Sequence, residues 1–186
     1  MFNTTDEQLI KKALAGNKKA WFSLISRYEK SIYNYGIRMT GSRQDSQDLM
    51  QDIFVSVFRN LASYQGTGSF RSWLFRIAHY RCVEFYRRRK PLVSLDDVPE
   101  IEEQENHSSS RSNPELNMQG DQTQRELMQA MQRLPVNQRA VVELKFFGQF
   151  TFDEIAEQLG VSANTAKSRL YSALEKLRAH LEVEYV

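Results

Sequence analysis

Apolar residues recur at helical spacing along most of the chain, and short polar or glycine-containing stretches interrupt them. Leu49, Ile53 and Val57, for example, are four residues apart, so they fall on one face of a helix. The first part of the chain is expected to form helices over 5–15, 18–39, 43–64 and 71–90. Two more are expected over 122–134 and 137–147, ahead of a pair of helices near the C-terminus. The pattern therefore predicts an all-α fold.

The C-terminal pair of helices lies within TFDEIAEQLGVSANTAKSRLYSALEKLR, residues 151–178. Thr151 and Glu154 have the spacing of a capping box that begins the first helix. Gly160 stands where a helix C-terminus favours a left-handed residue, and Ser162 is placed to cap the second helix. The apolar stripe of the second helix is expected to comprise Ala166, Leu170, Leu174, Leu177 and Leu181. This pattern is typical of a helix-turn-helix, whose second helix enters the major groove of DNA.

Hydrogen-bonding side chains and one lysine lie opposite that apolar stripe, in the N-terminal half of the second helix. They are Asn164, Thr165, Lys167, Ser168, Tyr171 and Ser172. Side chains of this kind meet base edges and phosphates in the major groove. The alternative interpretation is an ordinary helical hairpin whose polar face is solvated.

Charge is distributed unevenly, although the 186 residues carry a net charge of only +2. Residues 1–91 contain 16 Lys or Arg and 7 Asp or Glu, net +9, whereas residues 92–123 contain 1 and 8, net −7. Residues 124–186 contain 8 of each kind. The basic block favours a polyanionic partner, and the acidic stretch is too polar to fold alone. We therefore expect two small helical domains, 1–91 and 123–186, joined by a flexible acidic linker over 92–122.

Few residues offer the chemistry of an enzyme. Cys82 is the only cysteine, so no disulfide can form within the chain, and the three histidines are scattered. No cofactor and no metal are expected. The sequence contains no apolar run long enough to span a bilayer and no signal peptide. A cytoplasmic protein without membrane insertion is the simplest expectation.

Three carboxylates stand on one face of the helix expected over 43–64. Asp45, Asp48 and Asp52 are spaced at i, i+3 and i+7, within an otherwise basic domain. A metal site is one interpretation, although no histidine or cysteine is near in the sequence. A solvated face is a second interpretation, and a docking face for a basic protein partner is a third.

Cations alternate with aromatic residues in RSWLFRIAHYRCVEFYRRRK, residues 71–90. Such a mixture suits single-stranded nucleic acid, because cations track the phosphates and rings stack on exposed bases. The alternative is that the aromatic residues belong to the core and the arginines form a solvated end. Both interpretations hold together if Trp73, Leu74, Ile77 and Phe85 face the core while the cations face outward.

Taken together, these stretches resemble an extracytoplasmic-function sigma factor of bacterial RNA polymerase. DSQDLMQDIFVSVFRNL and SFRSWLFRIAHYRCVEFYRRR are similar to conserved region 2 of that family, and LPVNQRAVVELKFFGQFTFDEIAEQLGVSANTAKSRLYSALEKLR is similar to region 4. The resemblance covers nearly the whole chain, and the order and spacing of the stretches make it specific. A short acidic linker in place of the family's middle region is also typical of this subfamily.

The resemblance implies a role for each stretch. The residues that would dock on the clamp coiled coil of the polymerase β′ subunit are Asp48, Gln51, Asp52, Phe54 and Phe58. The residues that would capture a flipped base of the −10 promoter element and hold the melted strand are Tyr64, Gly66, Ser69, Phe70, Arg71, Trp73, Arg76, Tyr80, Arg87, Arg88, Arg89 and Lys90. The last domain would contact the polymerase β flap and read the −35 element through Asn164, Thr165, Lys167, Ser168, Arg169, Tyr171 and Ser172.

Two positions depart from the common pattern of the family. Many relatives have Asn where this chain has Tyr80, and many have Arg where it has Ser172. These departures leave the preferred promoter sequence open. The role of Arg169 is open as well, between a phosphate contact and helix packing.

The sequence therefore predicts a sigma factor, a protein that works by binding and is not an enzyme. It would bring core RNA polymerase to promoter DNA, as duplex and as melted strand, to start transcription in a stress response under anti-sigma control. Whether an anti-sigma factor holds it at the inner face of the membrane is left open. Two other classes remain as alternatives: a two-domain regulator that binds an operator as a dimer, and a metal-dependent nuclease built on the three aspartates.

Overall fold

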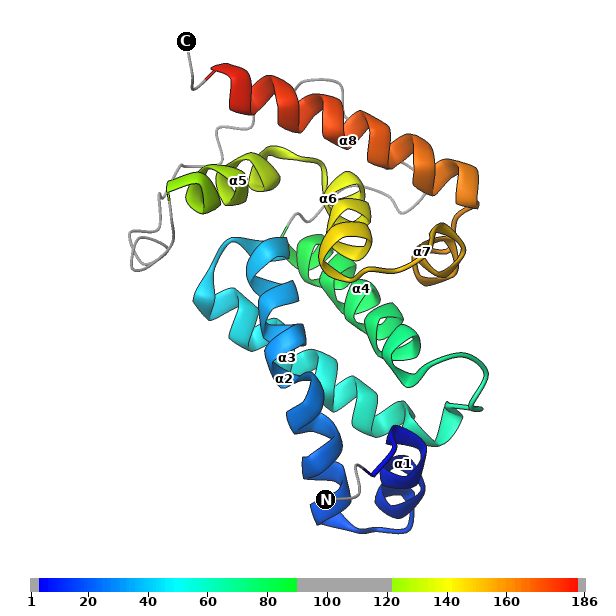
Figure 1. Cartoon of the computed structure of the whole chain (residues 1–186). Helices are drawn as coiled ribbons and strands as arrows, with labels where there is room; N and C mark the ends of the chain where they lie inside the picture. The colour runs from blue at the N-terminus through cyan, green and yellow to red at the C-terminus, as the bar shows by residue number, and fades with distance from the viewer. Residues whose placement is uncertain (1–3, 90–121, 184–186) are drawn as a thin grey trace.

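The computed structural model describes residues 4–89 and 122–183, and every regular element within these ranges is helical (Figure 1). The first range contains α1 (Asp6–Leu14), α2 (Lys18–Thr40), α3 (Arg43–Asn60), the 3-10 turn η1 (Leu61–Ser63) and α4 (Phe70–Arg89). The second contains α5 (Gln122–Arg133), α6 (Val136–Val142), the π-helical turn η3 (Glu143–Phe147), α7 (Phe152–Leu159) and α8 (Ala163–Val183). The predicted all-α fold with two helical parts is confirmed. The linker predicted over 92–122 lies, except for its last residue, outside the described residues.

Local capping explains where the first helices begin and end. The side chain of Asn17 begins α2 by accepting a hydrogen bond from the N–H of Ala20, at 3.1 Å. The helix ends at Gly41, whose φ of 70° is left-handed. Ser42 then caps α3 by accepting from the N–H of Asp45, at 3.3 Å. The break that the sequence predicts between residues 39 and 43 is therefore confirmed. None of the described helices has the length and apolarity to cross a membrane.

The core of the first part lies between α2, α3 and α4. Its fully buried side chains include Leu24, Ile32, Tyr35, Met39, Leu49, Ile53, Val57, Leu74 and Cys82. Helices α2 and α3 approach each other closely at Gly36, where the absence of a side chain makes room. A Cβ at this position would lie only 2.5 Å from the Oγ of Ser46. That hydroxyl donates to the carbonyl of Tyr33 at 2.8 Å, so it bonds across the same crossing.

The helix-turn-helix has the predicted local chemistry. Thr151 and Glu154 form a capping box at the start of α7, and Gly160 ends the helix with a φ of 66°. The hydroxyl of Ser162 accepts from the N–H of Thr165 at 3.0 Å and so caps α8. The buried residues of α8 are Ala166, Leu170, Ala173 and Leu177. The prediction for Leu174 was wrong, since 37% of it is exposed and the helical repeat places Ala173 inward in its stead.

The helix predicted over 137–147 changes pitch at η3. The N–H of Gly148 bonds the carbonyl of Glu143, five residues earlier, at 2.8 Å. This wider turn leaves Leu144 buried but turns Phe146 and Phe147 outward, where they are 54% and 41% exposed. Two phenylalanines of an apolar run therefore lie on the surface.

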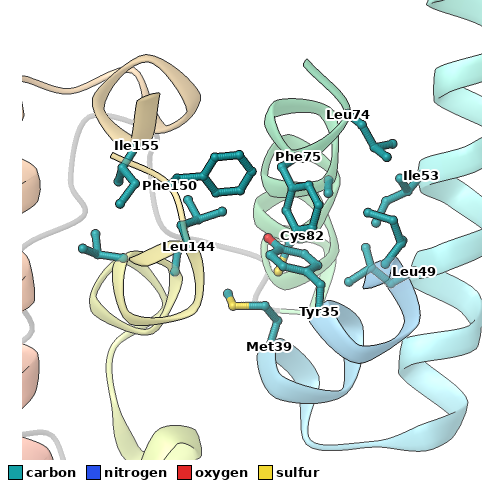
Figure 2. Close-up of a cluster of buried hydrophobic side chains, with 14 of the residues drawn as sticks. Tyr35, Met39, Leu49, Ile53, Leu74, Phe75, Cys82, Leu144, Phe150 and Ile155 are labelled. Atoms are coloured by element: carbon teal, nitrogen blue, oxygen red, sulfur yellow. The ribbon is translucent and has the colours of Figure 1, made fainter. Parts of the chain in front are cut away.

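The two helical parts share one continuous apolar core. Helix α7 lies against α4 and helix α6 lies against α2, and α8 packs on both α6 and α7 (Figure 1). Figure 2 shows Leu144 and Phe150 of the second part facing Tyr35 and Phe75 of the first. The rings of Phe75 and Phe150 meet edge to face, with centroids 5.3 Å apart. The helix-turn-helix thereby lies next to the arginine-rich helix α4.

Candidate nucleic-acid and partner interfaces

The acidic face predicted on α3 is exposed and has apolar neighbours. Asp48, Gln51 and Asp52 are exposed, Phe54 is half-buried, and Phe58 is 63% exposed. Further apolar residues beside them that sequence reasoning did not assign to this face are Trp21, whose ring meets Phe58 edge to face at 5.1 Å, and Val55, which is 48% exposed. Carboxylates around exposed rings suit a protein partner that offers cations and apolar groups.

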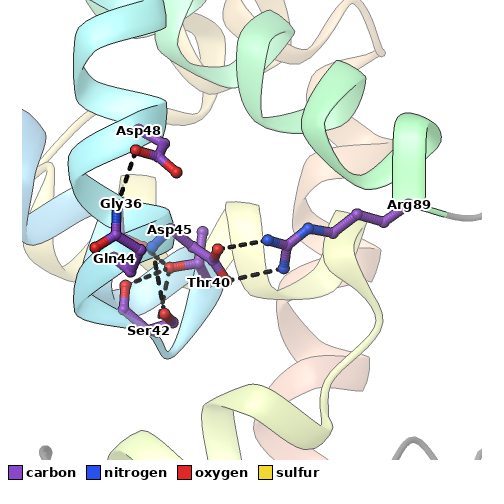
Figure 3. Close-up of polar contacts among 7 residues, drawn as sticks. All are labelled: Gly36, Thr40, Ser42, Gln44, Asp45, Asp48 and Arg89. Atoms are coloured by element: carbon purple, nitrogen blue, oxygen red, sulfur yellow. Dashed lines mark hydrogen bonds and ion pairs between the residues drawn. The ribbon is translucent and has the colours of Figure 1, made fainter.

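Two of the carboxylates on this helix pair with the cationic end of α4. Arg89 makes a bidentate ion pair with Asp45, one arm of which is 2.8 Å long (Figure 3). Arg88 lies 3.7 Å from Asp52, and both of these side chains are more than half exposed. Exposed pairs of this kind contribute little stability, about 0–1 kcal/mol each. They do place the predicted docking face and the predicted strand-binding end next to each other. Lys90, predicted to join this end, lies outside the described residues.

Three aromatic rings lie where the chain turns from η1 into α4. Tyr64, Phe70 and Trp73 have ring centroids 5.5–5.6 Å apart. The loop between Tyr64 and Phe70 contains Gly66 and Gly68 at φ values of 74° and 76°, which an L side chain rarely adopts. The hydroxyl of Tyr64 donates to the carbonyl of Gly68 at 3.0 Å. This loop is exposed, whereas Phe70 is buried beneath it. Half-buried rings beside an open, glycine-bearing loop can stack on an extruded base.

The predicted strand-binding residues of α4 divide between two environments. Arg76, Tyr80 and Arg87 are exposed. Arg71 is half-buried, because its Nη2 donates to the carbonyl of Gly148 at 2.6 Å and its guanidinium lies 4.4 Å from the ring centre of Phe150. Ser69 caps the helix, accepting from the N–H of Ser72 at 3.1 Å. The structure thus brings most of the predicted set onto one helix, with its first arginine covered by the second part.

The predicted −35 residues occupy the first half of α8. Asn164, Lys167, Ser168, Tyr171 and Ser172 are exposed, and Thr165 is half-buried. Arg169 is half-buried, and its guanidinium is near enough to His79 of α4 to help lower the pKa of that imidazole. The free polar edge of the helix therefore comprises the other residues of the predicted set.

Sequence reasoning missed two residues beside that edge, Lys145 and Phe152. The ammonium groups of Lys145 and Lys167 lie 4.7 Å and 5.6 Å from the ring centre of Phe152. Lys145 also donates to the carbonyl of Phe150 at 3.2 Å. The ring of Phe152 thus lies close to two cations that come from separate elements. Only the three-dimensional fold brings these residues together.

The buried titratable groups of α4 carry no charge at neutral pH. Burial, with the nearby Arg169 guanidinium, lowers the pKa of His79 to about 4. Burial raises the pKa of the Cys82 thiol to about 12, so it is neither a reactive thiolate nor a metal ligand at neutral pH. Among the described residues, no group of three His, Cys, Asp or Glu side chains is arranged to hold a metal ion. The three aspartates of α3 lie in ion pairs or hydrogen bonds with Arg89, Gln44 and Arg88 instead.

Known proteins share this arrangement. Sigma-70 region 2 matches residues 24–91, and sigma-70 region 4 matches residues 124–177; together they cover more than half of the chain. The RNA polymerase sigma-H factor of Pseudomonas aeruginosa is 28% identical, over 95% of this chain and 94% of its own length. The ECF RNA polymerase sigma factor SigW of Bacillus subtilis is also 28% identical, over 92% of this chain and 94% of its own length.

A solved structure shows the same fold. The sigma factor RpoE of Bartonella quintana, co-crystallised with the anti-sigma factor NepR, has a TM-score of 0.68 and 21% identity, covering 89% of this chain and 98% of that one. The matched regions occur in the order that the sequence predicts, and the relatives match end to end. The chain belongs to the sigma-70 family and is a sigma factor of the extracytoplasmic-function type.

Proposed function

We propose that this protein binds core RNA polymerase, carries it to promoters and holds the melted strand while transcription starts. One observation carries the proposal: three surfaces of different chemistry lie on separate elements, in the order of the sigma regions. They are the acidic and apolar face of α3, the ring-lined loop before α4, and the exposed polar edge of α8. Each surface is suited to association with a macromolecule, and we infer that this association takes place in the cytoplasm.

Docking on polymerase uses the exposed face of α3. Asp48 and Asp52 offer carboxylates to the basic side chains of the β′ clamp coiled coil, and Gln51 offers an amide. Phe58 offers a ring that is 63% exposed in the free protein and would be covered on docking. Exposed rings near the centre of an interface supply most of its affinity, while charges around them steer the encounter.

Promoter recognition uses the other two surfaces. The exposed edge of α8, from Asn164 to Ser172, meets base edges of the −35 element, and Lys145 and Lys167 meet its phosphates. The loop over 64–69 receives a base extruded from the −10 element, against the rings of Tyr64 and Trp73. Extruding a base costs a few kcal/mol, which stacking and the arginines of α4 offset. Tethering two weak sites in one chain raises the effective concentration of each at correctly spaced elements.

Run-off transcription with purified core polymerase tests this function, on genomic fragments with and without the protein. Asp48→Arg should abolish the specific transcripts, because a cation would face the basic coiled coil. Asp48 is the sharper choice than Asp52, whose carboxylate also pairs with Arg88. Glu29→Arg is the matched control, since Glu29 is an exposed carboxylate on α2 and the change in charge is the same.

The alternative classes give different results in the same experiment. A dimeric regulator would produce no transcript and would bind duplex DNA stably without polymerase. A nuclease would cleave the template in the presence of a divalent cation and lose that activity on Asp48→Ala. Either result would refute the sigma role.

We also propose that an anti-sigma factor is a partner of this protein. The co-crystal of a sigma factor of the same fold with an anti-sigma factor supports this partner class. Affinity purification of the chromosomally tagged protein from its native cells, before and after stress, tests it. An inhibitor should co-purify before stress and be reduced after it, and purification of the unstressed protein without one would count against the proposal.

A further inference from the structure

Helix α1 lies against the part of the chain that leads into the ring-lined loop. It packs on α2 and lies beside η1, the turn that precedes the loop (Figure 1). Asp6, the first residue of α1, accepts a hydrogen bond from the hydroxyl of Tyr28 on α2. Its other carboxylate oxygen accepts from Arg27 Nη1 at 2.8 Å, and the same guanidinium donates to the carbonyl of Thr4. One carboxylate therefore joins α1 to two neighbouring residues of α2.

Tyr28 supports the ring cluster at the start of α4. Its ring meets the ring of Phe70 edge to face, with centroids 5.5 Å apart. Phe70 is 3% exposed, and its ring centroid lies 5.6 Å from those of both Tyr64 and Trp73. A line of direct contacts therefore runs from Asp6 through Tyr28 and Phe70 to the two rings that would stack on the extruded base.

The loop itself offers these rings little support. Gly66 and Gly68 have left-handed φ values, and a Cβ at either position would lie more than 4 Å from any described residue beyond its chain neighbours. Glycine also leaves the backbone more conformational freedom than any other residue. Because open space surrounds both glycines, the places of Tyr64 and Trp73 depend on Phe70 and on the residue that supports Phe70.

The charges of α1 reach the same loop. Burial, and after it the negative charges of Glu7 and Asp6, raise the pKa of the Tyr64 hydroxyl, so both carboxylates lie near that ring. Burial and the hydrogen bond to Asp6 also raise the pKa of the Tyr28 hydroxyl. Both tyrosines keep their protons at neutral pH, so Tyr28 remains a donor to Asp6.

We propose that Asp6 and Tyr28 are positioning residues for base capture: Asp6 holds the ring of Tyr28, and Tyr28 supports the rings that receive the extruded base. This inference rests on the proposed function, because it concerns the loop that is assigned to the −10 element. Sigma-70 region 2 matches residues 24–91, so α1 and its Asp6 lie outside that match. The two residues act by fixing the rings before the base arrives, which reduces the cost of ordering them on binding.

A thermodynamic cycle that combines protein variants with the removal of single bases tests this role. The probes are single-stranded oligonucleotides that cover the non-template strand upstream of a mapped run-off start site, each with one abasic position. Their binding to the complex of this protein with core polymerase is measured. In the wild type, the abasic site at the extruded position should weaken binding about tenfold or more, the scale of one base stacked on an aromatic ring. A purely structural defect would weaken binding of intact and abasic strands by the same factor.

Asp6→Ala and Tyr28→Phe remove the same hydrogen bond from its two sides. In each variant the penalty for the abasic site should fall to about threefold or less, because rings that are not held in place lose part of the stacking contact. The double variant should show no further fall, since both changes act on one contact. Glu7→Ala and Tyr33→Phe are the matched controls, because Glu7 is an exposed carboxylate in the same turn of α1 and Tyr33 is a half-buried tyrosine further along α2. Both controls should keep the wild-type penalty.

The cycle separates failure of the positioning role from failure of the proposed function. Helical content by circular dichroism should be the same in the wild type and in all four single variants. A wild-type penalty that persists in both Asp6→Ala and Tyr28→Phe would overturn the positioning role alone, and so would an equal fall in the two controls. A wild-type protein without a penalty at any position would refute base capture itself, and the positioning role with it.

Discussion

Arg139 offers a large and calculable perturbation, because the side chain is buried and its N–H groups are all engaged. Its guanidinium donates to three carbonyls and one amide oxygen of its own domain and to Met39 and Tyr86 across the interface. Arg139→Ala would leave buried carbonyls without donors, at about 1–3 kcal/mol for each one that water does not reach. With partial access of water, we expect a loss of about 3–5 kcal/mol in the free energy of unfolding.

A loss of that size is a substantial part of the stability of a small protein, about 5–15 kcal/mol. Urea unfolding followed by far-UV circular dichroism measures it. Arg139→Lys keeps the charge but not the planar fork, so it should lose about 2 kcal/mol. Tyr86→Phe removes an acceptor of Arg139 and a donor to the carbonyl of Met39, and it should lose about 1 kcal/mol. Arg133→Ala is the exposed control and should stay within about 0.5 kcal/mol of wild type. A loss below 1 kcal/mol for Arg139→Ala would refute the reasoning.

Three other perturbations have defined outcomes. Gly36→Ala places a Cβ 2.5 Å from the Oγ of Ser46, so it should lower the unfolding free energy by about 1–3 kcal/mol in a thermal melt. The pKa of His79 is lowered from 6.5 to about 4 in the folded protein. Between these two pH values the unfolded chain binds a proton at His79 that the folded protein does not bind, so the free energy of unfolding should fall as the pH drops from 6.5 to 4. The loss should total about 3 kcal/mol in urea titrations at successive pH values. Lys145→Gln and Lys167→Gln should each reduce by about 1 the slope of log affinity against log salt for the polymerase complex on promoter DNA.

Controls isolate each effect. His79→Gln should remove most of the extra loss between pH 6.5 and 4, although carboxylates elsewhere still titrate; an unchanged pH profile would exclude His79 as its source. Lys176→Gln, an exposed lysine late in α8, should leave the salt slope unchanged. An equal drop for Lys176 and Lys145 would mean that net charge, and not the cluster at Phe152, determines the slope. A fully stable Gly36→Ala protein would show that Ser46 can move aside.

Local signals in the sequence were sufficient to predict where the helices begin and end. Thr151, Glu154 and Gly160 fix the bounds of α7 through hydrogen bonds within three or four residues, so their effect does not depend on the rest of the fold. Periodicity was less reliable inside the last domain. The π-helical turn rotates Phe146 outward, and no residue type signals such a turn.

The contact between the domains could not be predicted in this way. Arg38, Arg139 and Glu143 belong to a residue class that usually lies in water, and their partners are 53 to 105 residues away in the chain. Glu143 did carry a signal, since it interrupts the apolar run VVELKFF. Such a charge must be paired when it is buried, but the sequence does not say with which residue. The assignments of individual residues to promoter and polymerase stay predictions.

Contacts with the second helical part already satisfy the side chain of Arg71 at the start of α4. Its guanidinium stacks on Phe150 and donates to the carbonyl of Gly148. A single strand would offer Arg71 the same two kinds of partner, a flat ring system in each base and oxygen acceptors in each phosphate. The strand contact proposed for Arg71 and its contacts with Gly148 and Phe150 are therefore alternatives. A change that strengthens the contacts with Gly148 and Phe150 is expected to weaken strand binding through Arg71.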